Sequence, residues 1–169
     1  RMEPVELPEM KEVNLDHPWA AKGKHGGDFK RITSTMYYIK DFDTYIKAKY
    51  DRMIENEQRW ESVQTADADV VLVAYGISSR ICKEAVYFAR KQGIRLGLLR
   101  PISLFPFPVK GFAEVNPDVK AYLTVEMSAL PQIERDVKIA CGQKVPVEHF
   151  LGGMHIPEYT TIIEKAVSL

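Results

Sequence analysis

From residue 69 onward, short runs of apolar residues alternate with stretches of helical periodicity. The first run, residues 70–74, is apolar without interruption, as expected for a parallel strand covered on both faces. This alternation predicts an α/β fold, a three-layer αβα, doubly wound and mostly parallel sheet. The predicted strands are residues 70–74, 94–99, 121–125 and 145–150, and the predicted helices are residues 79–92, 109–115, 131–140 and 159–167.

Ahead of this pattern, residues 41–62 carry mostly apolar side chains at positions i, i+3, i+4 and i+7, which predicts a long amphipathic helix. Residues 1–40 contain several prolines and glycines with little hydrophobic periodicity, and we expect an extended connector there. The chain opens on Arg1-Met2, which we interpret as the cut end of a longer polypeptide. The predicted division is a connector, 1–40, and a domain, 41–169, that includes the leading helix.

Composition excludes several classes of protein. The chain has 23 Lys and Arg against 23 Asp and Glu, so it lacks the basic excess that binds nucleic acid through a general phosphate field. Its two cysteines, Cys82 and Cys141, lie far apart without a CxxC, which gives no zinc or iron–sulfur spacing. We therefore expect buried free thiols in a reducing, cytoplasmic setting. No signal peptide or membrane-length apolar run occurs in the sequence.

Ligands of open α/β sheets bind beyond the carboxyl ends of the strands, where two glycine-containing turns are predicted. In the first turn, Gly76, Ser78 and Ser79 stand between a strand and a helix. Their backbone N–H groups could hold a phosphate or carboxylate, although a helix-capping turn is the favoured interpretation. In the second, Gly152 and Gly153 follow the last strand, and such a pair lets the backbone approach a ligand or another chain closely.

Two charged residues, Arg100 and Glu126, end buried strands at the same edge. An unpaired buried charge is costly, so each needs a partner. Arg100 could position a substrate anion or lock a loop or an interface, and Glu126 could act as an acid, a base or an ion-pair partner. Our default expectation is an ion pair between Arg100 and Glu126.

Metal and nucleophilic sites find little support in the sequence. His149 and His155 flank the Gly152-Gly153 turn, but no cysteine or carboxylate stands at metal-ligand spacing beside them. The chain also lacks a G-x-S-x-G motif, which argues against a serine hydrolase. We therefore predict no metal site and no Ser–His–Asp triad in this chain.

Three stretches resemble a known family. They are ADVVLVAYG at 68–76, LLRPISLFPFP at 98–108 and VEM at 125–127, and LLRPISLFPFP is the most specific. They are similar to the α-type, pyrimidine-binding subunit of 2-oxoacid:ferredoxin oxidoreductases, in its transketolase C-terminal-like domain. The segment 48–61 resembles the helix that precedes this domain in the branched-chain, 2-oxoisovalerate members, and residues 2–5 resemble the exit from a pyrimidine-binding domain. Around Ser128 to Pro131 the chain departs from the small polar residues common in the family.

The resemblance implies a non-catalytic domain of an enzyme complex that is inactive alone. Such a complex oxidatively decarboxylates a 2-oxoacid to an acyl-coenzyme A and passes the electrons to ferredoxin. Thiamine diphosphate, Mg²⁺ and iron–sulfur clusters are its cofactors, and none of their motifs matches a position here. The implied partners are the missing pyrimidine-binding domain, the pyrophosphate-binding and iron–sulfur subunits, and ferredoxin through the complex. The alternative is a stand-alone flavodoxin-like domain that binds a phosphate or nucleotide at the strand ends.

Overall fold

The computed structural model describes residues 9–12, 16 and 42–169. The chain divides into two units, Arg1–Phe42 and Asp43–Leu169, and the fold given below is that of the second. The connector predicted for residues 1–40 lies almost entirely outside the described residues, and its structure stays a prediction. Within the described part of the chain, no helix combines the length and the apolar character needed to cross a membrane.

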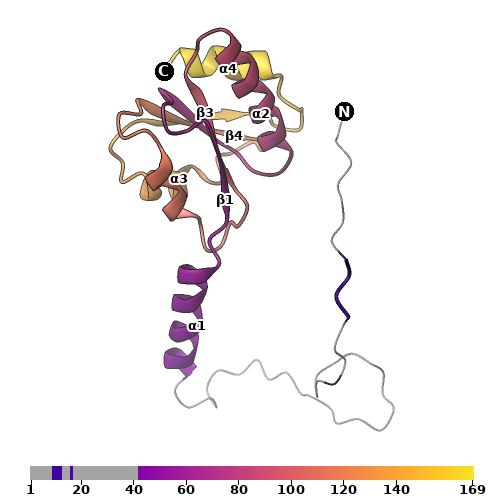
Figure 1. Ribbon diagram of the computed structural model, residues 1–169, viewed down its shortest axis with the longest axis vertical. Helices are drawn as coiled ribbons and strands as arrows, with labels where there is room; N and C mark the ends of the chain where they lie inside the picture. Colours follow the sequence, from indigo (N-terminus) through magenta and orange to yellow (C-terminus); the bar gives the residue numbers. More distant parts are fainter. Residues whose placement is uncertain (1–8, 13–15, 17–41) are drawn as a thin grey trace. The chain divides into compact units, whose positions relative to one another are not determined.

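Five strands form one mixed sheet in the order β1-β3-β2-β4-β5 (Figure 1). Strands β2, β3, β4 and β5 are parallel neighbours, whereas β1 runs antiparallel along β3 at one edge. The bounds are β1 Trp60–Val63, β2 Val70–Val73, β3 Leu96–Pro101, β4 Ala121–Glu126 and β5 Val147–Leu151. The predicted mostly parallel sheet is therefore confirmed.

Helices cover both faces of the sheet because successive strand residues point to opposite sides. Val70 and Leu72 of β2 pack with α2, Gly76–Lys91, and α4, Tyr159–Val167. Val71 and Val73 pack with the 3₁₀ helix η2, Val109–Glu114, and with α3, Glu134–Ala140. The ribbon accordingly shows α2 and α4 on one side of the strands and α3 on the other (Figure 1). The predicted three-layer architecture is confirmed.

The leading helix is shorter than predicted. Helix α1, Phe42–Asn56, ends six residues before residue 62, and the segment after it becomes the unpredicted strand β1. The N–H groups of Ile102 and Ser103 both donate to the carbonyl of Arg59, at 2.9 and 3.1 Å, and β1 then pairs residue by residue with β3. Pairing with a strand some 40 residues away leaves no trace in local periodicity, so the helical stripe was extended too far.

Glycines follow the ends of two helices. Gly93 after α2 has φ +78° and Gly142 after α3 has φ +67°, the left-handed conformation that favours glycine at this position. The last helix, α4, has the bounds that the sequence predicts, Tyr159–Val167. Local sequence signals are therefore sufficient to predict a helix end when the residues that end the helix lie in the same segment.

Candidate functional site

Strands β2 and β4 are neighbours, but their connections leave the sheet toward opposite faces, to α2 and to α3. This is a topological switch point, the place where open α/β sheets bind ligands. Two polar side chains meet there, Tyr75 just after β2 and Glu126 at the end of β4. The sequence pattern singled out Glu126, whereas Tyr75 was missed because an aromatic residue after an apolar run is typical of core packing.

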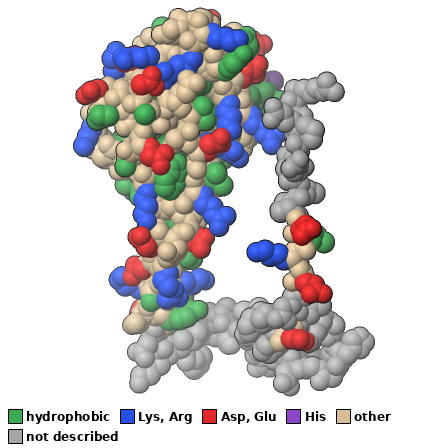
Figure 2. Space-filling view, viewed as in Figure 1, with side chains coloured by type: hydrophobic (Ala, Val, Ile, Leu, Met, Phe, Trp, Pro, Cys, Tyr) green, Lys and Arg blue, Asp and Glu red, His purple; other side chains and the backbone are tan. Residues whose placement is uncertain are grey.

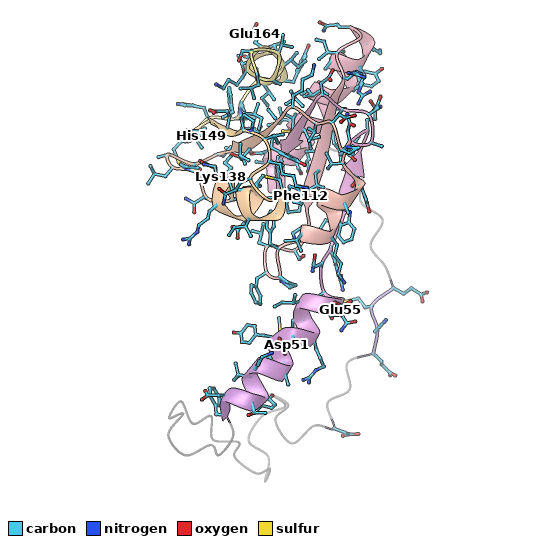
Figure 3. All side chains as sticks on the ribbon, turned by 90° about the vertical axis from the view of Figure 1, so that its left-hand side faces the viewer. Asp51, Glu55, Phe112, Lys138, His149 and Glu164 are labelled. Carbon is cyan, nitrogen blue, oxygen red and sulfur yellow. The ribbon has the colours of Figure 1, made fainter. Side chains whose placement is uncertain are left out.

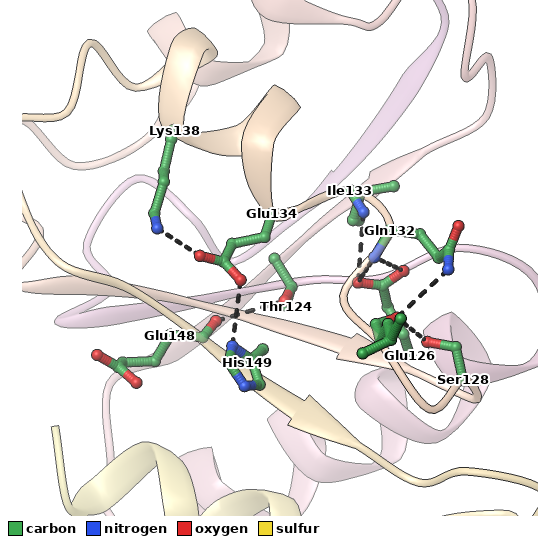
Figure 4. Close-up of polar contacts among 10 residues, drawn as sticks. Thr124, Glu126, Ser128, Gln132, Ile133, Glu134, Lys138, Glu148 and His149 are labelled. Atoms are coloured by element: carbon green, nitrogen blue, oxygen red, sulfur yellow. Dashed lines mark hydrogen bonds and ion pairs between the residues drawn. The ribbon is translucent and has the colours of Figure 1, made fainter.

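Glu126 is buried, with 1% of its surface exposed, and its carboxylate accepts hydrogen bonds from three groups, of which Figure 4 shows the backbone N–H groups of Gln132 and Ile133. The backbone N–H of Gln132 donates to both oxygens at 3.0 and 3.1 Å, and that of Ile133 donates at 3.4 Å. The hydroxyl of Tyr75 donates to Oε2, also at 3.4 Å. The carboxylate therefore fastens the loop after β4 and the start of α3 to the end of its own strand.

The pKa of Tyr75 is raised by burial of the phenol and by the negative charge and hydrogen bond of Glu126. At neutral pH the phenol consequently keeps its proton and serves as a donor to the carboxylate. The arrangement positions loops and satisfies a buried charge. Its polar groups face one another, which explains how a carboxylate can be buried at the switch point.

The expected ion pair between Arg100 and Glu126 is wrong. Arg100 Nη1 donates instead to Glu61 Oε2 at 3.1 Å, because β1 runs beside β3 and places Glu61 opposite Arg100. Glu61 also accepts from Lys83 of α2 at 2.6 Å. Lys83 first, and then Arg100, lower the pKa of Glu61 against an opposing effect of burial. Glu61 was overlooked because its whole strand was assigned to a helix.

Within the described part of the chain, Arg100 keeps one buried nitrogen, Nε, without a hydrogen-bond partner. The side chain as a whole is 37% exposed and already neutralised by Glu61. Arg100 of β3 is thus linked through Glu61 to β1, and Glu61 is linked in turn to Lys83 of α2. The roles expected for Arg100, toward a ligand anion or in locking a loop or an interface, stay predictions.

The Gly76–Ser79 turn is the first turn of α2 itself. Helix α2 begins at Gly76, whose φ of +56° favours glycine, and no side chain caps the helix start. Both serines are buried, and the hydroxyl of Ser79 donates to the carbonyl of Gly76 at 2.7 Å. The favoured interpretation as a side-chain-capped turn is therefore wrong, because the Ser79 hydroxyl donates to a carbonyl and accepts from no N–H group of the helix start. The anion site proposed for Gly76, Ser78 and Ser79 stays a prediction.

The Gly152-Gly153 pair does approach another segment closely, and that segment belongs to the same chain. Gly152 N–H donates to the carbonyl of Glu126 at 2.9 Å, and Gly153 N–H donates to the carbonyl of Ser128 at 3.2 Å. A Cβ at Gly152 would lie 2.8 Å from the carbonyl oxygen of His155, closer than side chains tolerate. The turn after β5 is thereby joined to the turn after β4.

A second polar cluster joins β5 to α3 (Figures 3 and 4). Glu134 accepts from Lys138 and lies 3.2 Å from His149 Nδ1, and the pKa of Glu134 is lowered mainly by Lys138. Across residues 9–12, 16 and 42–169, no three His, Cys, Asp or Glu side chains gather to hold a metal ion. This donor set does not fit Mg²⁺ or an iron–sulfur cluster.

A surface hollow of about 330 Å³ lies between η2 and the end of α3, and its lining includes Phe112, Tyr122 and Cys141. Burial raises the pKa of Tyr122 to about 12, so the phenol stays neutral there. None of the residues predicted to bind a ligand lines this hollow. The site predictions and the hollow therefore concern different parts of the fold.

Among known protein families, residues 68–160 match the family model of pyruvate:ferredoxin oxidoreductase core domain II. The ketoisovalerate oxidoreductase subunit VorB of Methanothermobacter marburgensis is 38% identical over 96% of this chain and 47% of its own length. The 2-oxoglutarate synthase subunit KorA of Methanocaldococcus jannaschii is 33% identical over 64% of this chain and 29% of its own length. The chain spans about half the length of VorB.

Solved structures share the fold. A 2-oxoglutarate:ferredoxin oxidoreductase from Magnetococcus marinus, with 2-oxoglutarate, coenzyme A and succinyl-CoA bound, superposes with a TM-score of 0.64 over 78% of this chain and 24% of its own, at 15% identity. A split-gene transketolase, an inactive beta4 tetramer, superposes with a TM-score of 0.52 over 66% of this chain and 42% of its own, at 21% identity. Two findings agree with the family resemblance seen in the sequence. The family model covers residues 68–160, and VorB matches nearly the whole chain. The chain therefore belongs to the 2-oxoacid:ferredoxin oxidoreductase family, in which it comprises core domain II.

Proposed function

We propose that this chain is the non-catalytic C-terminal domain of the α-type subunit of a thiamine diphosphate-dependent 2-oxoacid:ferredoxin oxidoreductase. The complete complex oxidatively decarboxylates a 2-oxoacid to an acyl-coenzyme A and delivers the electrons to ferredoxin. The observation that carries this proposal is the 38% identity to VorB over 96% of the chain. Because that match covers 47% of VorB, we assign the activity to a larger assembly that includes this chain.

The substrate that we propose is a branched-chain 2-oxoacid, 2-oxoisovalerate. Two ketoisovalerate oxidoreductase subunits match 96% of the chain, at 38% and 37% identity. The 2-oxoglutarate synthase subunits match shorter stretches, such as the 64% covered by the M. jannaschii protein. The additional matched residues support the branched-chain assignment.

A non-catalytic role is supported by the use of the polar groups at the switch point. The carboxylate of Glu126 accepts hydrogen bonds from backbone N–H groups and from Tyr75. The Ser79 hydroxyl bonds within its own helix turn, and nearby Arg100 bonds to Glu61. The described residues offer no ligand set for Mg²⁺ or an iron–sulfur cluster. We assign thiamine diphosphate, Mg²⁺ and the clusters to the pyrimidine-binding domain, the pyrophosphate-binding subunit and the iron–sulfur subunit.

The flavodoxin-like alternative is not favoured. A stand-alone phosphate binder would also use side chains at the strand ends, and in this chain Arg100 is paired with Glu61 while the Ser79 hydroxyl bonds to the carbonyl of Gly76. The family match also accounts for residues 68–160 without invoking a nucleotide.

The proposal is tested by recovering the native assembly through an affinity tag at the carboxyl terminus of the polypeptide that the chromosomal gene encodes. The purified complex is assayed for coenzyme A-dependent reduction of methyl viologen with 2-oxoisovalerate, 2-oxoglutarate and pyruvate. We expect the highest kcat/KM with 2-oxoisovalerate, and no reduction by the isolated 169-residue chain. Turnover by the rigorously purified chain, or a complex inactive toward every 2-oxoacid, contradicts the proposal. A preference for 2-oxoglutarate contradicts only the branched-chain assignment.

A further inference from the structure

Large apolar side chains are exposed along the edge of the sheet that is formed by the carboxyl-terminal ends of its parallel strands, where the connections after these strands begin. Six of them are between 50% and 92% exposed, and they follow β3, β4 and β5. Ile77, in the first turn after β2, is 49% exposed at the same edge. We call these residues the apolar edge, and the six are Ile102, Leu104, Phe105, Leu130, Met154 and Ile156.

The rest of the α/β domain is different. Apart from Ile77, helices α2 and α3 expose one such residue each, Tyr87 and Ile139, and η2 exposes Val109. The opposite end of the sheet has Val167 and Leu169 at the described C-terminus. Soluble proteins rarely expose a large concentration of apolar side chains unless it contacts another protein, a ligand or a membrane. The apolar edge is therefore a candidate contact surface.

Helix α1 extends this surface. Tyr50 of α1 meets the ring of Phe105 edge-on, with 5.5 Å between the centroids, and Lys110 Nζ bonds to Glu55 at 2.9 Å. None of the 15 residues of α1 is buried, and Tyr45 and Ile54 are 61% and 46% exposed. An isolated helix of about 15 residues is marginal in water, so its apolar stripe needs a partner. Figure 2 shows hydrophobic side chains at the surface of α1 and of the domain beside it.

We propose that the apolar edge and the apolar stripe of α1 pack against the amino-terminal half of this chain's own subunit. This inference rests on the proposed function. The first supporting observation is length, because VorB is about twice as long as the stretch it shares with this chain. The second is direction, because α1 carries the incoming polypeptide to this edge, where Tyr50 contacts Phe105.

The chemistry of the edge favours an apolar protein surface over a charged ligand. The six side chains carry no charge, and the arginine at the end of β3 is neutralised by Glu61. Interfaces owe most of their affinity to a few buried apolar or aromatic side chains near the centre. Phe105, which meets Tyr50 of α1, is in the position to supply one of them.

The test begins with the gene, by sequencing upstream of the Arg1 codon. The polypeptide encoded there in the same frame is produced separately, and its Kd for the 169-residue chain is measured by sedimentation. The edge variant combines Leu104→Lys, Leu130→Lys and Met154→Lys, residues that are 50%, 70% and 92% exposed. The matched control places the same charges on the flanks, with Tyr87→Lys, Ile139→Lys and Val167→Lys at 54%, 62% and 60% exposure.

We expect the edge variant to raise Kd at least tenfold and the control variant to keep the wild-type value. Both variants should unfold at the same temperature as each other, since all six side chains are exposed. An upstream sequence without an open frame overturns this inference together with the proposed function. Failure of the upstream polypeptide to bind, equal Kd values for the two variants, or a Tm loss confined to the edge variant overturns the docking surface and leaves the proposed function standing.

Discussion

A buried carboxylate is stable only when donors surround it, and Glu126 obtains them from two neighbouring backbone amides and a tyrosine. Its own backbone carbonyl also accepts from Gly152. Through one residue, the turns after β4 and β5 and the start of α3 hold a single arrangement. The charge thus has a structural role that strand position alone does not reveal.

Replacing Glu126 with Leu should lower the free energy of unfolding by roughly 1–3 kcal/mol, because the amides of Gln132 and Ile133 lose their acceptor. Glu126→Gln should cost less, since its remaining carbonyl oxygen still accepts. The measurement is urea unfolding followed by circular dichroism. Glu84→Leu, at an exposed position of α2, is the control and should change stability by about 0.5 kcal/mol or less. Equal losses in Glu126→Leu and Glu84→Leu would contradict the role of the carboxylate.

Glu61 makes stability depend on pH. Its folded pKa lies below the ordinary value of 4.5, mainly because of Lys83, so its contribution is present above 4.5 and is lost as pH falls through the folded pKa. We expect wild type to exceed Glu61→Gln in thermal stability at neutral pH, and this difference to shrink as the pH falls below 4.5. Thermal unfolding of both proteins across that range measures it. A difference independent of pH would rule out the ion-pair origin.

At the scale of elements, β1 exists because of its neighbours. The indole of Trp60 packs where Gly111 of η2 has no side chain, and a Cβ there would lie 2.8 Å from the ring. Glu61, Arg100 and Lys83 then join β1 to β3 and α2. The strand is only four residues long, so these contacts, more than its own sequence, place it at the edge of the sheet.

Gly111→Ala should destabilise the protein by about 1–3 kcal/mol, since overpacking forces the indole or η2 to move. In a Trp60→Leu background the same substitution should cost clearly less, because the atoms that it meets are gone. A double-mutant cycle on urea unfolding gives the coupling directly. If Gly111→Ala costs the same in both backgrounds, the close approach to Trp60 is not what excludes a side chain.

Helix α1 should be the first part of the described domain to open. It buries none of its residues, whereas Val71, Leu72 and Val73 of β2 are fully buried. Amide hydrogen exchange of the isolated chain, read by mass spectrometry, should show fast exchange in α1 and the slowest exchange in β2 and β4. Protection of α1 equal to that of β2 would mean that the helix is already packed within this chain.

At the scale of the whole molecule, two cysteines report on global and local exposure. Cys82 is completely buried on α2, and burial raises the pKa of its thiol, while Cys141 after α3 is partly exposed. In a thiol-labelling experiment with DTNB, we expect one fast reaction from Cys141 and a slow one limited by unfolding from Cys82. Cys141→Ser should abolish the fast phase alone. Two fast phases in the folded wild type would show that the α2 side of the core is open.

Much of the architecture could be predicted because it depends on which face of each segment is buried. Three features can be recognised from the residues of one segment alone. They are the uninterrupted apolar run of β2, the helical stripe of α4 and the glycines at 93 and 142. The resemblance of LLRPISLFPFP likewise identified the family that the comparisons show. Local periodicity and motif spacing are sufficient for such features because burial and chain reversal are local consequences of residue type.

The candidate site was harder to predict because it depends on which segments meet. Arg100 and Glu126 were both recognised as charges at strand ends, yet Arg100 bonds to Glu61 and Glu126 bonds to amides of the following loop. Choosing between these partners requires knowing that β1 lies against β3 and that the loop after β4 folds back onto its strand. The hydrophobic periodicity of the sequence predicts neither of these contacts.

The sequence by itself determined the α/β class, the alternation of strands and helices and the family, because the hydrophobic pattern and a specific motif suffice for these. Only the tertiary structure decided that residues 60–63 are a strand, that the polar groups of the switch point satisfy one another, and that the exposed apolar side chains share one edge. The physical reason is the same in each case. Ion pairs, ladder hydrogen bonds and surface patches are made between residues distant in sequence, and their energies exist only after the chain has brought those residues together.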